Sequence, residues 1–121
     1  MVGLNVRAPF ARLLANGTKK IETRRYKVPD HYLGHRIAII ETGKGKAKII
    51  GSAELTGWYT YRDRDHWHRE SGLHLVERGS DFDWLDDKPR YGWKVSDARL
   101  LASPVDAPSK RGLVWCKGIF F

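Results

Sequence analysis

The sequence predicts one α+β domain over residues 1–121, a small mixed β-barrel of about six strands with two or three helices. Short apolar or alternating runs recur between Gly, Pro and polar clusters, which is typical of strands. One early segment instead places its apolar residues at helical spacing. A chain of 121 residues buries roughly two-thirds of its unfolded surface, which is enough for one core but not for a second.

The N-terminal segment predicts a strand, a helix and a second strand. An apolar run predicts the first strand at Leu4–Val6. The helix is predicted at Pro9–Asn16, because Pro suits a first helical turn and apolar residues recur at i, i+3 and i+4: Phe10, Leu13 and Leu14. Gly17 ends the helix, since glycine readily adopts the left-handed conformation found there. Alternation then predicts a strand at Ile21–Arg25.

Four further strands are predicted from apolar runs, at Arg36–Glu41, Lys48–Leu55, Trp93–Leu101 and Val114–Phe120. The first two of these flank Gly43–Lys46, which predicts an exposed hairpin turn with its lysines in water. A second helix is predicted somewhere within Asp63–Arg78.

The net charge of +8 is concentrated in the first half of the sequence. Residues 1–50 hold eleven Lys or Arg and three acids, whereas residues 51–121 hold eleven basic and eleven acidic side chains. A positive field around a site in the first half favours polyanions such as RNA. The alternative is a solvated surface that bears lysines without binding nucleic acid.

No apolar run approaches the length of a membrane span, and the N-terminus lacks the apolar run of a signal peptide, so we expect a cytoplasmic protein with no membrane partner.

The single cysteine, Cys116, excludes an internal disulfide, and its apolar neighbours favour a buried thiol. His66 and Glu70 are spaced to share a helix face, but a third metal ligand is not apparent. We therefore predict neither a metal nor a cofactor.

A triplet of charged residues follows the predicted helix. Alternation places Lys20, Glu22 and Arg24 on one strand face, about 6.6 Å apart, with Ile21 pointing to the core. Glu22 and Arg24 are then expected to face a concave, solvent-filled cleft. The alternative is a salt-linked strand face, in which each exposed pair contributes only ~0–1 kcal/mol to stability.

This triplet belongs to a longer pattern, Arg-x-Pro-Phe-Ala at residues 7–11 followed by Gly-x-Lys-x-x-Glu-x-Arg at residues 17–24. The pattern resembles the ASCH domain family, a branch of the PUA-like superfamily of small RNA-associated β-barrels. The resemblance extends to a hydrophobic strand with an internal glycine at Ile49–Leu55 and to the triplet Tyr91-Gly92-Trp93, but not to Tyr59–Lys88. It implies a PUA-like barrel with a basic cleft that binds RNA or a modified nucleoside.

The predicted binding site comprises six residues of this pattern: Arg7, Lys19, Lys20, Glu22, Arg24 and Tyr91. Lys19 and Arg24 would hold phosphate or base edges, while Glu22 would accept from an exocyclic amine or a sugar hydroxyl. Arg7 would support the site from the first strand.

Aromatic residues offer stacking surfaces for bases. Tyr91 and Trp93 share a strand face, where Tyr91 is a stacking platform or a core residue and Trp93 is the better core candidate. The stretch Tyr59–Asp87 interleaves aromatics with arginines and could form one wall of a nucleotide cleft. Alternatively, Trp67 and Trp84 serve the core and the many aspartates of this stretch repel phosphate. We assign no single residue of this stretch a binding role.

The first alternative function is a hydrolase. Some bacterial ASCH-like proteins are amidohydrolases of N4-acetylcytidine, and their catalytic set is a Lys after the Gly, a Thr three residues beyond it and a later Glu. Lys19 matches the first, but Glu22 occupies the Thr position, and Thr23 is expected on the opposite strand face. The later Glu could be one of three: Glu54, Glu70 or Glu77. A carboxylate such as Glu22 would also keep the lysine charged, which argues against this chemistry.

Ribonuclease activity fits the residues better. Cleavage through the 2′-hydroxyl needs a proton acceptor, a proton donor and a cation for the phosphate, and Glu22, Lys19 and Arg24 include all three types. Nuclease activity has been attributed to some ASCH proteins, and in that case Lys19 and Glu22 would be catalytic. The third interpretation, an interaction module without nucleic acid, is favoured if the basic residues are scattered in the fold.

Overall fold

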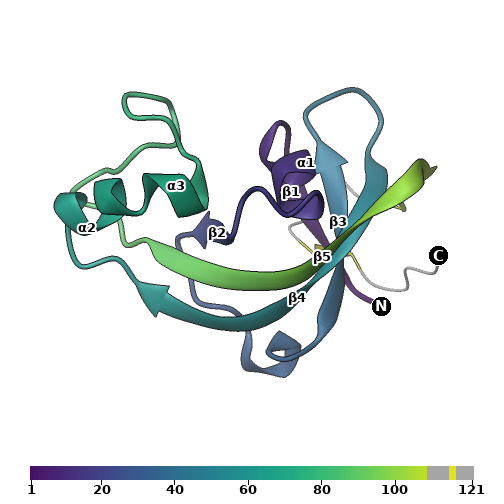
Figure 1. Cartoon of the computed structure of the whole chain (residues 1–121), viewed down its shortest axis with the longest axis horizontal. Helices are drawn as coiled ribbons and strands as arrows, with labels where there is room; N and C mark the ends of the chain where they lie inside the picture. The colour runs from purple at the N-terminus through teal and green to yellow at the C-terminus, as the bar shows by residue number, and fades with distance from the viewer. Residues whose placement is uncertain (109–114, 117–121) are drawn as a thin grey trace.

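The computed structural model describes residues 1–108 and the backbone of residues 115–116 (Figure 1). The elements in chain order are β1 (Gly3–Arg7), α1 (Phe10–Ala15), β2 (Ile21–Arg24), the 3₁₀ turn η1 (Asp30–Tyr32), β3 (Arg36–Thr42), β4 (Lys48–Thr60), α2 (Arg64–Arg69), α3 (Ser71–His74), β5 (Tyr91–Asp106) and β6 (Trp115–Cys116). Together they confirm the predicted α+β class.

The strands form one mixed sheet in the order β2-β5-β4-β3-β1-β6. Only β1 and β3 pair in parallel, and the other pairs are antiparallel. In the part of the chain that the structure describes, the edge strands β2 and β6 do not pair with each other, so the sheet is open. The predicted closed barrel is therefore not observed, although β4 and β5 curve together through three register shifts (Figure 1).

Five of the predicted strands are confirmed, but β4 and β5 are longer than predicted. Their pairing continues through Trp58 opposite Trp93 to Thr60 opposite Tyr91, past the register shift near Gly57. The predicted second helix is two short helices, α2 and α3. Of the predicted strand Val114–Phe120, Trp115 and Cys116 form β6, and the rest lies outside the described residues together with the Cys116 side chain.

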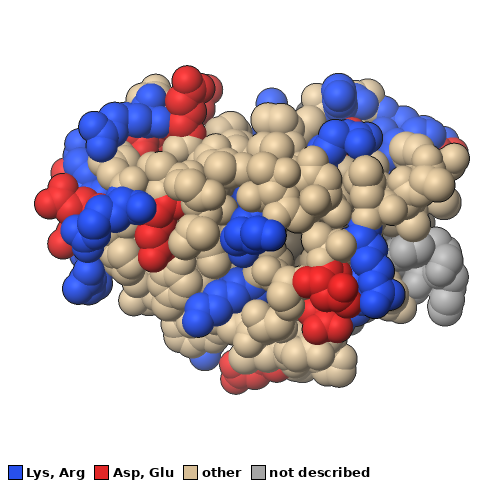
Figure 2. Space-filling model, in the orientation of Figure 1, with Lys and Arg blue, Asp and Glu red and all other residues tan. Residues whose placement is uncertain are grey.

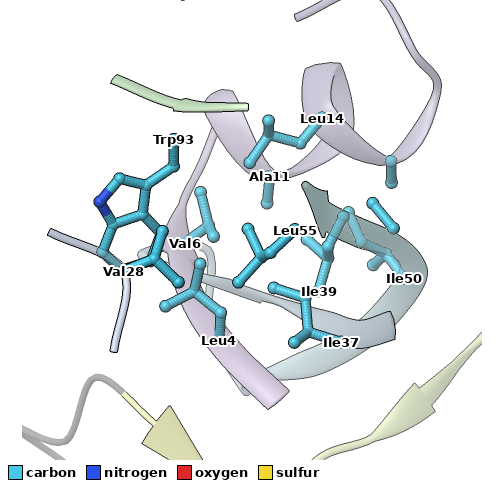
Figure 3. Packing of buried hydrophobic residues seen from close by; sticks show 12 residues of the cluster. Leu4, Val6, Ala11, Leu14, Val28, Ile37, Ile39, Ile50, Leu55 and Trp93 are labelled. Carbon is cyan, nitrogen blue, oxygen red and sulfur yellow. The ribbon is translucent and has the colours of Figure 1, made fainter. Parts of the chain in front are cut away.

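The main core lies between α1 and the sheet (Figure 3). Buried aliphatic side chains from α1, β1, β3 and β4 meet Trp93 of β5, and all of them are at most 2% exposed: Leu4, Val6, Leu14, Ile37, Ile39, Ile50 and Leu55. The internal glycine Gly51 is needed here, because a Cβ at this position would lie 2.4 Å from the Arg99 carbonyl oxygen and 2.8 Å from the Ala15 Cβ. The absence of a side chain lets α1 pack directly on the sheet.

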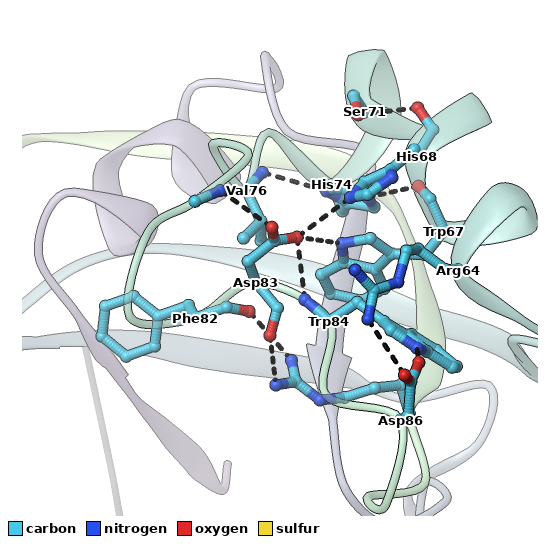
Figure 4. Close-up of polar contacts among 12 residues, drawn as sticks. Arg64, Trp67, His68, Ser71, His74, Val76, Phe82, Asp83, Trp84 and Asp86 are labelled. Atoms are coloured by element: carbon cyan, nitrogen blue, oxygen red, sulfur yellow. Dashed lines mark hydrogen bonds and ion pairs between the residues drawn. The ribbon is translucent and has the colours of Figure 1, made fainter.

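The segment between β4 and β5 folds into a lobe around Asp83 (Figure 4). The Asp83 carboxylate accepts hydrogen bonds from Trp67 Nε1 (3.0 Å) and from the backbone N–H groups of Gly79 and Trp84 (2.8 Å each), and it lies 3.3 Å from His68 Nε2. Desolvation alone would raise the pKa of Asp83, but these hydrogen bonds outweigh it and hold the pKa well below its usual range. The Asp83 carboxylate therefore links α2, through Trp67, to the loop residues Gly79 and Trp84 of the lobe.

Candidate functional site

A pocket of about 420 Å³ opens where β1, β2 and the N-terminal end of α1 meet the lobe. Four of the six predicted site residues line it: Arg7, Lys19, Glu22 and Arg24. Its far wall comes from the lobe, through Val76, Asp81 and Phe82. The suggestion that the middle segment forms one wall of the cleft therefore matches the placement of the lobe.

Glu22 and Arg24 form a fixed pair in β2. Glu22 Oε2 accepts from both Arg24 Nε (3.0 Å) and Arg24 Nη2 (2.7 Å), and Nη2 also donates to the Asn5 carbonyl (2.9 Å). The Arg24 guanidinium lies 5.8 Å from the Trp93 ring centroid. Among the described residues, Glu22 Oε1 has only an ion pair to Lys19 Nζ at 3.9 Å, which is too long for a hydrogen bond. One carboxylate oxygen is thus engaged and the other remains available as an acceptor.

Lys19 is buried beside this pair, with a side chain that is 1% exposed. Its Nζ donates to the backbone carbonyl of His74 at the end of α3 and lies 4.9 Å from the Phe10 ring centroid. Burial is the largest effect on the pKa of Lys19 and lowers it. Glu22 raises the pKa and Arg24 lowers it, and the net result is a pKa of about 8. The expected effect of Glu22 is present, but desolvation outweighs it, so this argument against lysine-based chemistry does not hold.

Lys20 lies outside the pocket lining. It is exposed and precedes β2, with its backbone N–H donating to the Leu73 carbonyl (2.9 Å). Lys20 therefore does not join Glu22 and Arg24 in the pocket, and β2 begins only at Ile21. Lys19 takes the place next to Glu22, while Ile21 is buried as predicted.

Tyr91 is paired in register with Arg24 but does not line the pocket. It is half-buried and contacts Trp58 edge to face, with ring centroids 5.8 Å apart, on the margin of the main core. This placement favours its core role over stacking. Trp93 is fully buried, as predicted, and its Nε1 donates to the Tyr26 carbonyl (2.9 Å).

Several lining residues were given no individual role from the sequence, although Phe82 lies in the stretch suggested as one wall of the cleft. Phe82 is 43% exposed and meets Phe10 edge to face at 5.5 Å, and Tyr26 is 39% exposed. Arg90 is buried and donates to the carbonyls of Phe82 (3.0 Å) and Asp83 (2.9 Å), which connects the pocket wall to the lobe. These contacts join segments far apart in the chain, so spacing within one strand or helix could not predict them.

Positive charge gathers at this pocket. Its lining holds five cations against two carboxylates: Arg7, Lys19, Arg24, Arg25 and Arg90 against Glu22 and Asp81. Elsewhere the charges are mixed, and Figure 2 shows acidic and basic side chains next to each other over the lobe at the left. Near the β3–β4 hairpin, Lys46 and Lys48 both pair with Asp106. The basic residues around Lys19 are therefore not scattered.

None of the three candidate glutamates for an amidohydrolase lines the pocket. Glu54 pairs with Arg36 (3.6 Å), Glu77 is exposed, and Glu70 accepts from the Tyr59 hydroxyl and lies 3.4 Å from His66 Nε2. Thr23 is among the lining residues, although alternation predicts it on the face opposite Glu22.

No group of three or more His, Cys, Asp or Glu side chains is arranged to hold a metal ion within residues 1–108. No helix in the described ranges has both the length and the apolar character that crossing a bilayer requires.

The chain was compared with known proteins. A family model described as ASCH domain matches residues 4–105. No curated protein matches the chain significantly. The crystal structure of ASCH from Zymomonas mobilis is similar, with 22% sequence identity and a TM-score of 0.71, covering 87% of this chain and 72% of that chain. Two substituted forms of that protein give TM-scores of 0.67 and 0.70 at 20% and 21% identity, again over 87% of this chain and over 72% and 74% of theirs. At such identities the likeness concerns the fold.

Proposed function

Because this chain belongs to the ASCH domain family, we propose that its pocket binds RNA or a modified nucleoside, with a single unstacked base entering first. The observation that carries this proposal is the free acceptor Glu22 Oε1 inside a pocket that is otherwise rich in cations. A volume of about 420 Å³ lies within the range of small-molecule sites.

The Glu22 carboxylate determines whether the base or the phosphate of a nucleotide enters the pocket. Glu22 is 5% exposed, and a phosphate placed against a carboxylate would be repelled, whereas a base amino group would donate to Oε1. Arg7 and Arg25 line the same pocket and are exposed, so they are placed to hold the phosphate outside. The base therefore occupies the interior and the backbone stays at the rim.

Two exposed rings support this orientation. Phe82 and Tyr26 both line the pocket, and stacking of a base on an aromatic ring contributes roughly 1–3 kcal/mol. The Phe82 ring contacts Phe10 edge to face, and the Phe82 carbonyl accepts a hydrogen bond from Arg90. Such a ring offers a stacking face with little loss of conformational entropy.

Fluorescence anisotropy with a fluorescein-labelled mixed-sequence RNA hexamer tests this proposal. We expect Glu22→Gln to weaken binding by about tenfold, because it replaces a charged acceptor by a neutral amide. The matched control is Glu77→Gln, an exposed glutamate outside the pocket lining, which should bind like the unaltered protein. Equal binding by the two variants, or no binding of the hexamer at low salt, would remove the proposal.

A second candidate function, RNA cleavage, is favoured by the lysine itself. Lys19, with a pKa of about 8, lies 3.9 Å from the Glu22 carboxylate, so a proton donor and a proton acceptor are adjacent. Incubation of the same hexamer with protein should then give cleavage that falls by ~10²-fold in both Lys19→Ala and Glu22→Gln. Cleavage that persists in both variants would come from a contaminant.

An amidohydrolase of N4-acetylcytidine is the least supported activity. Glu22 stands where that chemistry needs a hydroxyl, and the candidate distal glutamates lie outside the pocket lining. We expect no acetate release from N4-acetylcytidine, and rapid release would mean that Thr18 or Thr23 supplies the hydroxyl.

A further inference from the structure

His74 has a fixed ring orientation in the lobe. The side chain is fully buried, Nδ1 accepts from the Val76 N–H (2.9 Å), and Nε2 lies 2.8 Å from the Trp67 carbonyl (Figure 4). A carbonyl can only accept, so the proton is on Nε2 and the imidazole is neutral. The ring also stacks on Trp67 with centroids 4.1 Å apart. His74 is thus held on both edges and on one face.

This ring bridges a sharp reversal of the chain. Leu75, between His74 and Val76, has φ +58°, a left-handed conformation that is unfavourable for a leucine. The bond from the Val76 N–H to Nδ1 spans that residue and stabilises the turn. The reversal ends α3 and presents the His74 carbonyl to Lys19 Nζ, which comes from the segment before β2.

The carbonyl determines where the ammonium group lies. With Nζ bound to the His74 carbonyl, the distance from Nζ to Glu22 Oε1 is 3.9 Å instead of a contact distance. We propose that His74 is a positioning residue that holds Lys19 back from Glu22 and so keeps Oε1 available for ligand. This inference deepens the proposed function and rests on it for the meaning of the free oxygen.

The pH behaviour of Lys19 follows from the groups around it. Glu22 and Arg24 face it from β2 and His74 from α3, while α1 presents the uncharged Phe10 ring. Arg7, Arg25, Asp81 and Arg90 line the same pocket. If the carbonyl is released, Nζ closes on Glu22 and gains hydration, and both changes favour the charged amine.

NMR titration of ¹³C-labelled lysine tests the inference without any ligand. The Lys19 resonance, assigned by its loss in Lys19→Met, should titrate with a midpoint near 8 in the unaltered protein. In His74→Leu, which lacks both ring hydrogen bonds, we expect the midpoint to rise by about one pH unit or more toward the ordinary lysine value. His74→Asn should restore much of the lower midpoint, because its Oδ1 can accept from the Val76 N–H.

The matched control is Ser71→Ala, which removes the bond from Ser71 Oγ to the His68 carbonyl in the same helix but leaves His74 intact. An unshifted midpoint in a folded His74→Leu variant, or an equal shift in Ser71→Ala, would overturn the inference. If His74→Leu does not fold, His74→Gln takes its place. A glutamine can still donate to the Trp67 carbonyl but lacks the Nδ1 acceptor, so the Lys19 midpoint is again expected to rise. No RNA binding by the unaltered protein, together with the expected midpoint shift in His74→Leu, would count against the proposed function alone.

Discussion

Lys19 brings an ammonium group into a part of the molecule where its side chain is only 1% exposed. Burial is the largest effect on its pKa, Glu22 opposes it, and the result is a pKa of about 8. The motif predicted that Lys19 and Glu22 belong to one site. It could not predict the burial, because the groups that exclude water come from α1 and from α3, the latter 55 residues away.

The lowered pKa makes stability depend on pH in a defined window. Folded Lys19 holds its proton less tightly than an unfolded lysine, so the unfolded state carries more protons between about pH 8 and 10.5, and the free energy of unfolding rises with pH there. The shift from 10.5 to about 8 corresponds to about 3 kcal/mol. Urea unfolding should show this rise in the unaltered protein and not in Lys19→Met.

The matched control for that measurement is Lys44→Met, an exposed lysine in the hairpin. It should retain the full rise between pH 8 and 10.5. Parallel stability curves for Lys19→Met and the unaltered protein would mean that Lys19 keeps an ordinary pKa.

At the scale of elements, α1 and the sheet followed from local patterns, while the lobe did not. Apolar spacing predicted α1, and apolar runs or alternation predicted the strands, because each pattern lies within one element. The ends of β4 and β5 depend on their pairing with each other, which a single strand does not encode. The lobe depends on Asp83, whose side-chain partners are as much as 16 residues away in the chain.

Gly51 tests how closely α1 packs on the sheet. Gly51→Ala would place a Cβ within 2.4 Å of a backbone oxygen, so we expect a loss of about 2–3 kcal/mol in the free energy of unfolding, measured in urea. Gly72→Ala in α3 is the matched control, because its added Cβ meets nothing within 4 Å. It should be neutral or slightly stabilising, and comparable losses in both variants would contradict the close approach.

Asp83 tests whether one carboxylate holds the lobe. We expect Asp83→Ala to lower the free energy of unfolding by about 2–3 kcal/mol at pH 7, because Trp67 Nε1 and the backbone N–H groups of Gly79 and Trp84 lose their acceptor. The pKa of Asp83 is depressed in the fold, so its contribution is present at neutral pH and is lost on acidification. The difference between the two proteins should therefore shrink below about pH 4. Asp87→Ala, at an exposed position, is the control and should change little.

At the scale of the whole molecule, the charge asymmetry of the sequence becomes a local feature of the surface. Four of the five pocket cations come from residues 1–50, and Arg90 is the exception. The hairpin lysines belong to the same half of the sequence, yet Lys46 and Lys48 pair with Asp106 of β5. Position in the sequence thus predicted the sign of the field but not which basic residues gather at the site.

This division predicts a salt dependence that separates the pocket from the hairpin. Binding of the RNA hexamer should weaken with salt at a log–log slope of roughly −0.7 for each phosphate contacted. Replacing Arg7 and Arg25 by Ala should remove about two contacts and flatten the slope by about 1.4, since both exposed guanidinium groups line the pocket. Replacing Lys44 and Lys46 by Glu should lower affinity only slightly and leave the slope nearly unchanged. A larger effect of the hairpin variant would place the RNA backbone along β3 and β4 instead, and binding that is insensitive to salt would exclude phosphate contacts as its source.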